Sequence, residues 1–96
     1  MNRPEELIDF VEGVLGPVVA HDRSRGGHLL ATLRAYLDAD CHTAPAAQRL
    51  TVRPNTVAYR LRRIGELCGR DLASTAALIE LGLALRSGDL GPEPAG

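Results

Sequence analysis

The sequence lacks lysine and tryptophan altogether, and aromatic residues make up only 3% of its 96 residues. A hydrophobic core therefore has to be built mainly from leucine, valine, isoleucine and alanine, within the 45% of residues that are hydrophobic. That mixture favours helices over strands. A chain of this length buries about 60% of its unfolded surface or slightly more, so we expect a single domain with one modest core.

Long apolar runs are also missing. No window approaches the ~18 uncharged apolar residues needed to cross a bilayer. The first ten residues, MNRPEELIDF, lack the apolar segment of a secretory signal. We therefore expect a cytoplasmic protein that has no membrane partner.

Cysteine is scarce, and acid–base clusters are few. Cys41 and Cys68 form no CxxC pair, so we expect two buried or semi-buried thiols and neither a disulfide framework nor a structural metal. Asp38, Asp40 and His42 could suggest acid–base chemistry, but no nucleophile or glycine-rich loop accompanies them. We expect no catalytic residues, no metal and no cofactor, and hence no enzyme.

Acidic residues are absent from positions 41–65, although the formal net charge of the chain is -1. That segment contains five arginines, four of them within the stretch RPNTVAYRLRR at positions 53–63. Arginine presents a planar fork of donors that suits phosphate oxygens and guanine edges. Most charged segments of this kind are simply exposed to solvent. Whether these arginines bind a partner therefore has to be judged from the helices around them.

Hydrophobic periodicity predicts about five helices and no sheet, which is an all-α fold. The first is expected over residues 4–15, with Gly16 and Pro17 ending it and residues 18–27 forming a connection. The remaining helices are expected at about residues 28–38, 44–50, 54–67 and 74–86. Thr43 is the nearest capping candidate for the third helix, and the fifth is apolar on more than one side.

The fourth predicted helix has one apolar stripe and one polar face. At 100° per residue, the stripe consists of Val57, Leu61, Ile64 and Cys68. The opposite face carries Asn55, Tyr59, Arg62, Arg63 and Glu66, with Thr56 at its edge and Ala58 and Arg60 on its flanks. The arginines are therefore expected at the surface.

A short alanine-rich helix, a turn at about residues 51–53 and this packed helix form a helix-turn-helix, whose second helix enters the major groove of DNA. Ala46 and Ala47 are small enough to let the two helices approach closely, and Val52 fills the turn. We expect residues 1–27 to lead into a DNA-binding domain at 28–86, followed by a disordered tail at 87–96.

The polar residues divide by the group that they could bind. Asn55 suits adenine and Arg62 suits guanine, while Thr56 and the free amides near Pro54 favour a phosphate at the positive helix end. Tyr59 either holds a phosphate through its hydroxyl or covers the hydrophobic residues beside it. The arginines expected at phosphates are Arg49, Arg53, Arg60 and Arg63.

The stretch AAQRLTVRPNTVAYRLRRIGELCGRDL resembles the C-terminal helix-turn-helix of the PucR/CdaR group of transcriptional regulators and, more distantly, the Fis-type DNA-binding domain. The motif L-x-V-x-x-N-T-x-x-Y-R-L-x-R-I is matched by Leu50, Val52, Asn55, Thr56, Tyr59, Arg60, Leu61, Arg63 and Ile64. The resemblance spans about residues 7–86. It implies a Fis-like helical bundle that binds an operator.

Three residues depart from the pattern of that group and of related proteins. Arg53 replaces a common histidine, and Pro54 replaces a frequent arginine or lysine, so the base preference can differ. Thr51 stands where many helix-turn-helix proteins have glycine, so we expect a turn made without an easy positive φ.

The leading hypothesis is a sequence-specific double-stranded DNA-binding module that acts as a homodimer, through the first, second or fifth helix. A single reading helix contacts too few bases for useful discrimination. The alternative is a helical protein-interaction module whose arginine face binds an acidic partner. No segment is of the kind that forms a small-molecule pocket, so we expect no effector ligand.

Overall fold

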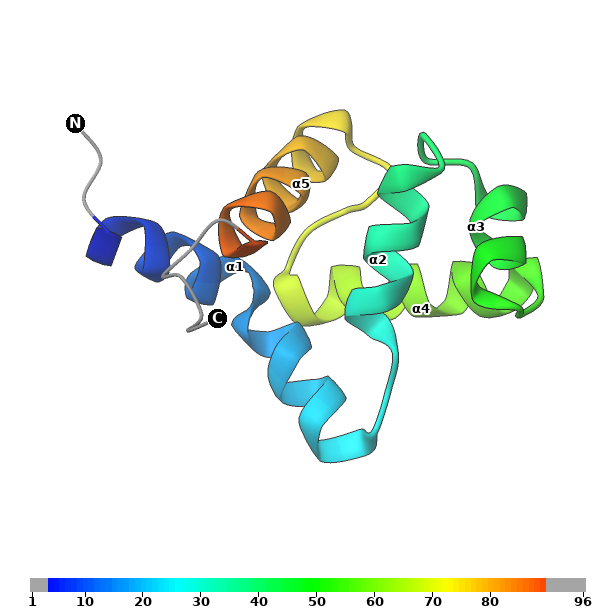
Figure 1. Ribbon diagram of the computed structural model, residues 1–96, viewed down its shortest axis with the longest axis horizontal. Helices are drawn as coiled ribbons and strands as arrows, with labels where there is room; N and C mark the ends of the chain where they lie inside the picture. The colour runs from blue at the N-terminus through cyan, green and yellow to red at the C-terminus, as the bar shows by residue number, and fades with distance from the viewer. Residues whose placement is uncertain (1–3, 90–96) are drawn as a thin grey trace.

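The computed structural model describes residues 4–89, which form five helices and no strand. The all-α prediction is confirmed. In chain order the helices are α1 (Pro4–Arg25), α2 (Leu29–Asp38), α3 (Thr43–Leu50), α4 (Pro54–Cys68) and α5 (Thr75–Asp89). In Figure 1, α2 crosses α4, α3 lies at one end of α4, and α1 and α5 lie toward the other. Within the described range, none of these helices combines the length and apolar character required to cross a bilayer.

Helix α1 is longer than the sequence predicts. It continues through Gly16 and Pro17 as far as Arg25. The predicted helix end and the predicted connection over residues 18–27 are therefore wrong. Proline cannot donate a hydrogen bond to the preceding turn, and the ribbon of α1 changes direction along its length in Figure 1.

Burial on both sides of Pro17 explains why the helix continues. A proline inside a helix costs about 3 kcal/mol. Val14 and Leu15 before it and Val18 after it are 5%, 4% and 0% exposed, and each such side chain contributes about 1.5–3 kcal/mol when buried. The continued helix is the conformation that places all three in one core.

Asp22 fixes the turn between α1 and α2. Its two carboxylate oxygens accept hydrogen bonds from the backbone N–H groups of Leu29, at 3.0 Å, and Leu30, at 3.1 Å. The side chain of His28, next to the start of α2, forms no cap. Gly26 reverses the chain with a φ of 61°, which glycine adopts without strain. A carboxylate from α1 thus caps α2.

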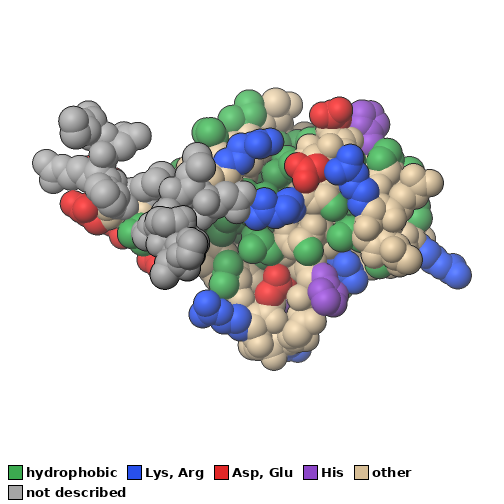
Figure 2. Space-filling view, in the orientation of Figure 1, with side chains coloured by type: hydrophobic (Ala, Val, Ile, Leu, Met, Phe, Trp, Pro, Cys, Tyr) green, Lys and Arg blue, Asp and Glu red, His purple; other side chains and the backbone are tan. Residues whose placement is uncertain are grey.

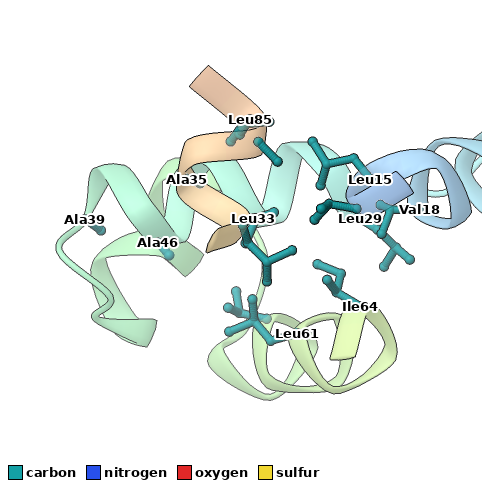
Figure 3. Packing of buried hydrophobic residues seen from close by; sticks show 14 of the residues in the cluster. Leu15, Val18, Leu29, Leu33, Ala35, Ala39, Ala46, Leu61, Ile64 and Leu85 are labelled. Carbon is teal, nitrogen blue, oxygen red and sulfur yellow. The ribbon is translucent and has the colours of Figure 1, made fainter. Parts of the chain in front are cut away.

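One hydrophobic core joins all five helices. Figure 3 shows side chains from α1, α2, α4 and α5 converging on the same space. Helix α3 contributes Ala46 and Ala47, which are 0% and 2% exposed, and it packs on α2 and α4. The small alanines allow this close approach, as predicted. The largest fully buried residues are Val18, Thr32, Leu33, Val57, Ile64 and Leu81.

The turn between α3 and α4 is made at residues 51–53, as predicted. Thr51 adopts a left-handed conformation, with φ 58° and ψ 44°, so the expectation of a turn without positive φ is wrong. The backbone N–H of Val52 donates to the carbonyl of Ala47 at 3.0 Å, which closes the end of α3. At the other end, Thr43 is the first helical residue and His42 precedes it, so the predicted cap at Thr43 is also wrong.

Helix α4 ends at Gly69, which has a φ of 66°. Arg70 then binds the fifth helix, because its Nη2 lies 2.8 Å from Oε2 of Glu80 and its Nε is bonded to Oε1. Its Nη1 donates to the carbonyl of Cys68 at 2.7 Å. Hydrogen bonding to Arg70 lowers the pKa of Glu80. One guanidinium therefore connects the end of α4 with α5.

Helix α5 extends to Asp89. Residues 87–89, which were expected in a disordered tail, are therefore helical. The rest of that predicted tail, residues 90–96, lies outside the described residues.

Candidate nucleic-acid interface

Helix α4 is held to the core by the predicted apolar stripe. Val57, Leu61 and Ile64 are 0%, 9% and 0% exposed. Cys68, at the end of the stripe, is half-buried, and its Sγ donates to the carbonyl of Val14 at 3.2 Å. Burial raises the pKa of this thiol. The packing leaves the opposite, polar face of α4 at the surface.

The start of α4 is open to solvent. Arg53, Pro54 and Asn55 are exposed, and Thr56 is half-buried. Pro54 is the first helical residue, the side chain of Arg53 forms no cap, and none of the residues in this first turn is acidic. The positive end of the helix dipole is therefore left without a nearby neutralising carboxylate in that turn.

Tyr59 and Arg62 form a pair on the outward face of α4. The guanidinium carbon of Arg62 lies 5.8 Å from the centroid of the Tyr59 ring, within the range of a cation–π interaction. Tyr59 is 58% exposed. Its ring is therefore mostly in solvent and does not act chiefly as a hydrophobic cover.

Arg60 points toward α2. Its Nη1 donates to Oγ1 of Thr32 at 3.2 Å, and Thr32 is fully buried. The sequence did not indicate this structural contact. A guanidinium has five N–H donors, so one bond to Thr32 leaves donors for a further ligand.

Arg63 is paired with Glu66 on the same helix, with 2.9 Å between Nη1 and Oε1. The two side chains are 37% and 59% exposed, and a pair in such a position contributes at most about 1 kcal/mol. Arg49 and Arg53 are exposed and have no carboxylate partner in the described part of the chain. Figure 2 shows a basic side chain projecting at the edge where α3 meets the start of α4.

A polar hollow lies between the last turns of α1 and the outward face of α4. Its volume is about 280 Å³, and its lining residues are His21, Arg25, Tyr59, Arg62, Arg63 and Glu66. The sequence alone does not assign His21 or Arg25 to the site, because its local pattern predicts both in a connection. The available signal was the run HDRSRGGH at positions 21–28, with two arginines and two histidines.

The eight predicted site residues all lie on α3, on the turn or on α4. The packing of α3 on α4 therefore brings together the segments that carry these residues. Five are exposed and three are half-buried; the exposed ones are Arg49, Arg53, Asn55, Tyr59 and Arg62, and the half-buried ones are Thr56, Arg60 and Arg63.

A short helix packed closely on a second helix, with the polar face of the second open to solvent, defines a helix-turn-helix domain. The model of the PucR C-terminal helix-turn-helix domain matches residues 29–87, so the chain belongs to this family. The resemblance found in the sequence is thereby confirmed. A domain of this family implies a DNA-binding transcription regulator.

Among curated proteins, the chain is 38% identical over 82 residues to the purine catabolism regulatory protein of Bacillus subtilis (strain 168). It is 32% identical over 85 residues to the proline-responsive transcriptional activator PutR of the same organism. It is 36% identical over 83 residues to the transcriptional activator PmfR of Paenarthrobacter nicotinovorans.

These matches cover 85%, 88% and 86% of this chain but only 15%, 21% and 17% of the three relatives. The chain thus spans about a fifth of their length or less. No solved structure matches the chain.

Proposed function

We propose that this chain is a sequence-specific double-stranded DNA-binding domain that places α4 in the major groove. The observation that carries this proposal is the division of α4 into two faces. Val57 and Ile64 are fully buried, whereas Asn55 and Arg62 are exposed on the other side. A helix anchored in this way can project its polar face between phosphate ridges without moving.

The outward residues have different roles in this proposal. Asn55 bonds an adenine edge, and Arg62 bonds a guanine edge. They are seven positions apart, which is about 10 Å along a helix, and the major groove is about 12 Å wide. Thr56, with the open N-terminal end of α4, binds a phosphate.

The remaining arginines and Tyr59 bind the DNA backbone in this proposal. Arg49 and Arg53 are free of carboxylate partners in the described residues. Arg63 exchanges Glu66 for a phosphate, and Arg60 uses the donors that Thr32 leaves open. Such contacts fix the position of the domain on DNA and carry no sequence information directly. The list of backbone-binding residues is Arg49, Arg53, Tyr59, Arg60 and Arg63.

In this proposal the chain binds DNA as a homodimer, with one copy of α4 for each half-site. Helix α5 exposes Ile79 and Leu83, at 58% and 56%, and Figure 2 shows hydrophobic side chains at the surface over α5. The two residues are four positions apart and therefore share one face of the helix. Packing of this face against its copy would present two reading helices to half-sites about 34 Å apart.

One relative is named a purine catabolism regulatory protein, and another a proline-responsive transcriptional activator. We accordingly propose that the domain serves transcription regulation. Its ligand is genomic DNA, so we place it in the cytoplasm.

A salt titration of DNA binding tests this function. If each subunit neutralises about five phosphates, log K falls by roughly 4 to 5 per log unit of salt per subunit. Asn55→Ala should also cost about 1–3 kcal/mol on the preferred duplex and relax the preference at one base pair. Salt-independent binding, or an Arg62→Ala/Arg63→Ala variant that loses an acidic protein partner while DNA binding is weak throughout, would favour a protein-interaction module.

A further inference from the structure

We propose that the C-terminal end of α1 binds a backbone phosphate of the DNA, through Arg25 and His21, in the hollow that these residues share with α4. This inference rests on the proposed function and extends its contact surface to a third helix. The family model matches residues 29–87, so both α1 residues precede the matched domain. The ligand is a phosphate diester at the edge of the groove that α4 occupies.

The charge of the hollow suits an anion. Glu66 is the one acidic residue in its lining, against three arginines, Arg25, Arg62 and Arg63. Arg25 and Arg62 have no carboxylate partner within the described part of the chain. Two guanidinium groups from different helices therefore border one small space, and neither charge is compensated. A phosphate in this space would bind Arg25 and be attracted by the positive charge of Arg62, whose donors stay on the guanine edge.

His21 adds an unsatisfied polar group. Its Nδ1 is buried and has no hydrogen-bond partner among the described residues. A buried nitrogen in this state destabilises the fold until it finds a partner. Rotation of the imidazole toward an acceptor in the hollow would provide the missing bond. The backbone carbonyls at the end of α1 repel an anion, so the side chains of His21 and Arg25 must supply the attraction.

The hollow also lies at a suitable distance from the bases. Its lining on α4 begins at Tyr59 and ends at Glu66. With Asn55 at a base edge, these positions lie about 6 to 16 Å further along the helix axis. The major groove is about 12 Å wide, so this part of α4 reaches the edge of the groove. The phosphate ridge passes there.

The chain offers a matched control for Arg25. Arg23 is also exposed and also belongs to the last turn of α1. It lines a different groove, of about 490 Å³, together with residues that include Val11 and Leu15. Arg23 therefore points away from α4, and its replacement removes the same charge from the same helix without touching the hollow.

The experiment compares Arg25→Gln with Arg23→Gln in the full chain. Binding is measured by fluorescence anisotropy at several salt concentrations. The probe is a labelled duplex of about 25 base pairs that the wild type selects from a random pool. A duplex of this length accommodates two half-sites one helical turn apart. Arg25→Gln should reduce the salt slope by about one per subunit and weaken binding to all sequences alike. Arg23→Gln should bind as the wild type does, and Arg25→Lys should retain the wild-type slope.

Equal slopes for Arg25→Gln and Arg23→Gln, on a duplex that the wild type binds, would overturn this inference and leave the proposed function intact. So would a slope for Arg25→Lys that is as low as that of Arg25→Gln. Failure of the wild type to bind the selected duplex would instead overturn the proposed function. Thermal melting of each variant checks the fold, and the exposure of both arginines predicts unchanged midpoints.

Discussion

Arg60 on α4 donates a hydrogen bond from Nη1 to Oγ1 of Thr32 on α2, at 3.2 Å. The Thr32 side chain is fully buried, and its hydroxyl in turn donates to the carbonyl of His28 at 2.7 Å. This chain of bonds links α4 to the start of α2, where Asp22 caps the backbone. The orientation of α4 thus depends on a polar contact as well as on its apolar stripe.

Replacement of Thr32 by valine should lower the free energy of unfolding by about 1–2 kcal/mol, because the charged donor of Arg60 loses its acceptor. Valine keeps the shape and the β-branching of threonine, so the core volume stays nearly constant. Urea unfolding measures the change. Thr75→Val, at an exposed position of α5, is the control. Equal stability of the two variants would show that the contact with Arg60 contributes nothing.

Replacement of Glu66 by glutamine should tighten DNA binding. The change frees Arg63 from its ion pair and removes a negative charge beside the proposed phosphate path. With a pair of this kind contributing about 0.5–1 kcal/mol, we expect an affinity gain of about two- to fivefold at low salt. Glu12→Gln makes the same charge change on α1, beside the other groove. An equal gain in both variants would indicate a general effect of net charge.

Replacement of either of two glycines by alanine should change the stability of the protein, in opposite directions. A Cβ at Gly65 would lie 2.7 Å from the backbone carbonyl oxygen of Arg70, whereas a Cβ at Gly13 meets nothing within 4 Å. Gly13→Ala should stabilise α1 by about 0.5–1 kcal/mol through helix propensity. Gly65→Ala should destabilise by about 1–3 kcal/mol, because the end of α4 has to shift. Thermal unfolding of both variants tests this, and a stabilised Gly65→Ala would refute the close approach.

Polar substitution on α5 should separate the proposed dimer. Ile79→Ser with Leu83→Ser removes the exposed apolar face, and sedimentation equilibrium should then give a monomer and a weaker affinity for a two-half-site duplex. Thr75→Ser with Ala76→Ser, also exposed on α5, should leave the assembly unchanged. A double variant at Ile79 and Leu83 that sediments as the wild type does would place the dimer surface elsewhere.

Local signals in the sequence were sufficient for most of the helices. The apolar stripe through Val57, Leu61 and Ile64 predicted which face of α4 is buried. Ala46 and Ala47 predicted the close packing of α3. Periodicity and side-chain size act within one or two helical turns, so a single sequence is enough to read them.

The failures at α1 and at Thr51 have one physical reason: tertiary packing overrode a local preference. Gly16 and Pro17 are strong local helix breakers, but the core gains Val18 only if α1 continues. Thr51 accepts a left-handed conformation because α3 and α4 are each fixed in the core on either side of it. The balance between a local backbone preference and the free energy of tertiary packing cannot be read from the local sequence.

Part of the candidate site could also not be predicted from local sequence patterns. Arg60 was expected only at a phosphate, but its bond to Thr32 joins residues 28 positions apart. His21 and Arg25 come close to Tyr59 and Arg62 only because α1 continues past its proline to the side of α4. Contacts between distant segments require the three-dimensional fold.

The most direct test of the account is an NMR titration of the labelled chain with the selected duplex. If α4 is the reading helix, the largest amide shifts should fall at residues 53–63, with a further shift at Arg25 and little change on the outward face of α5 at Ile79. Shifts confined to α5, or no shift along α4 while the duplex is bound, would contradict the central claim.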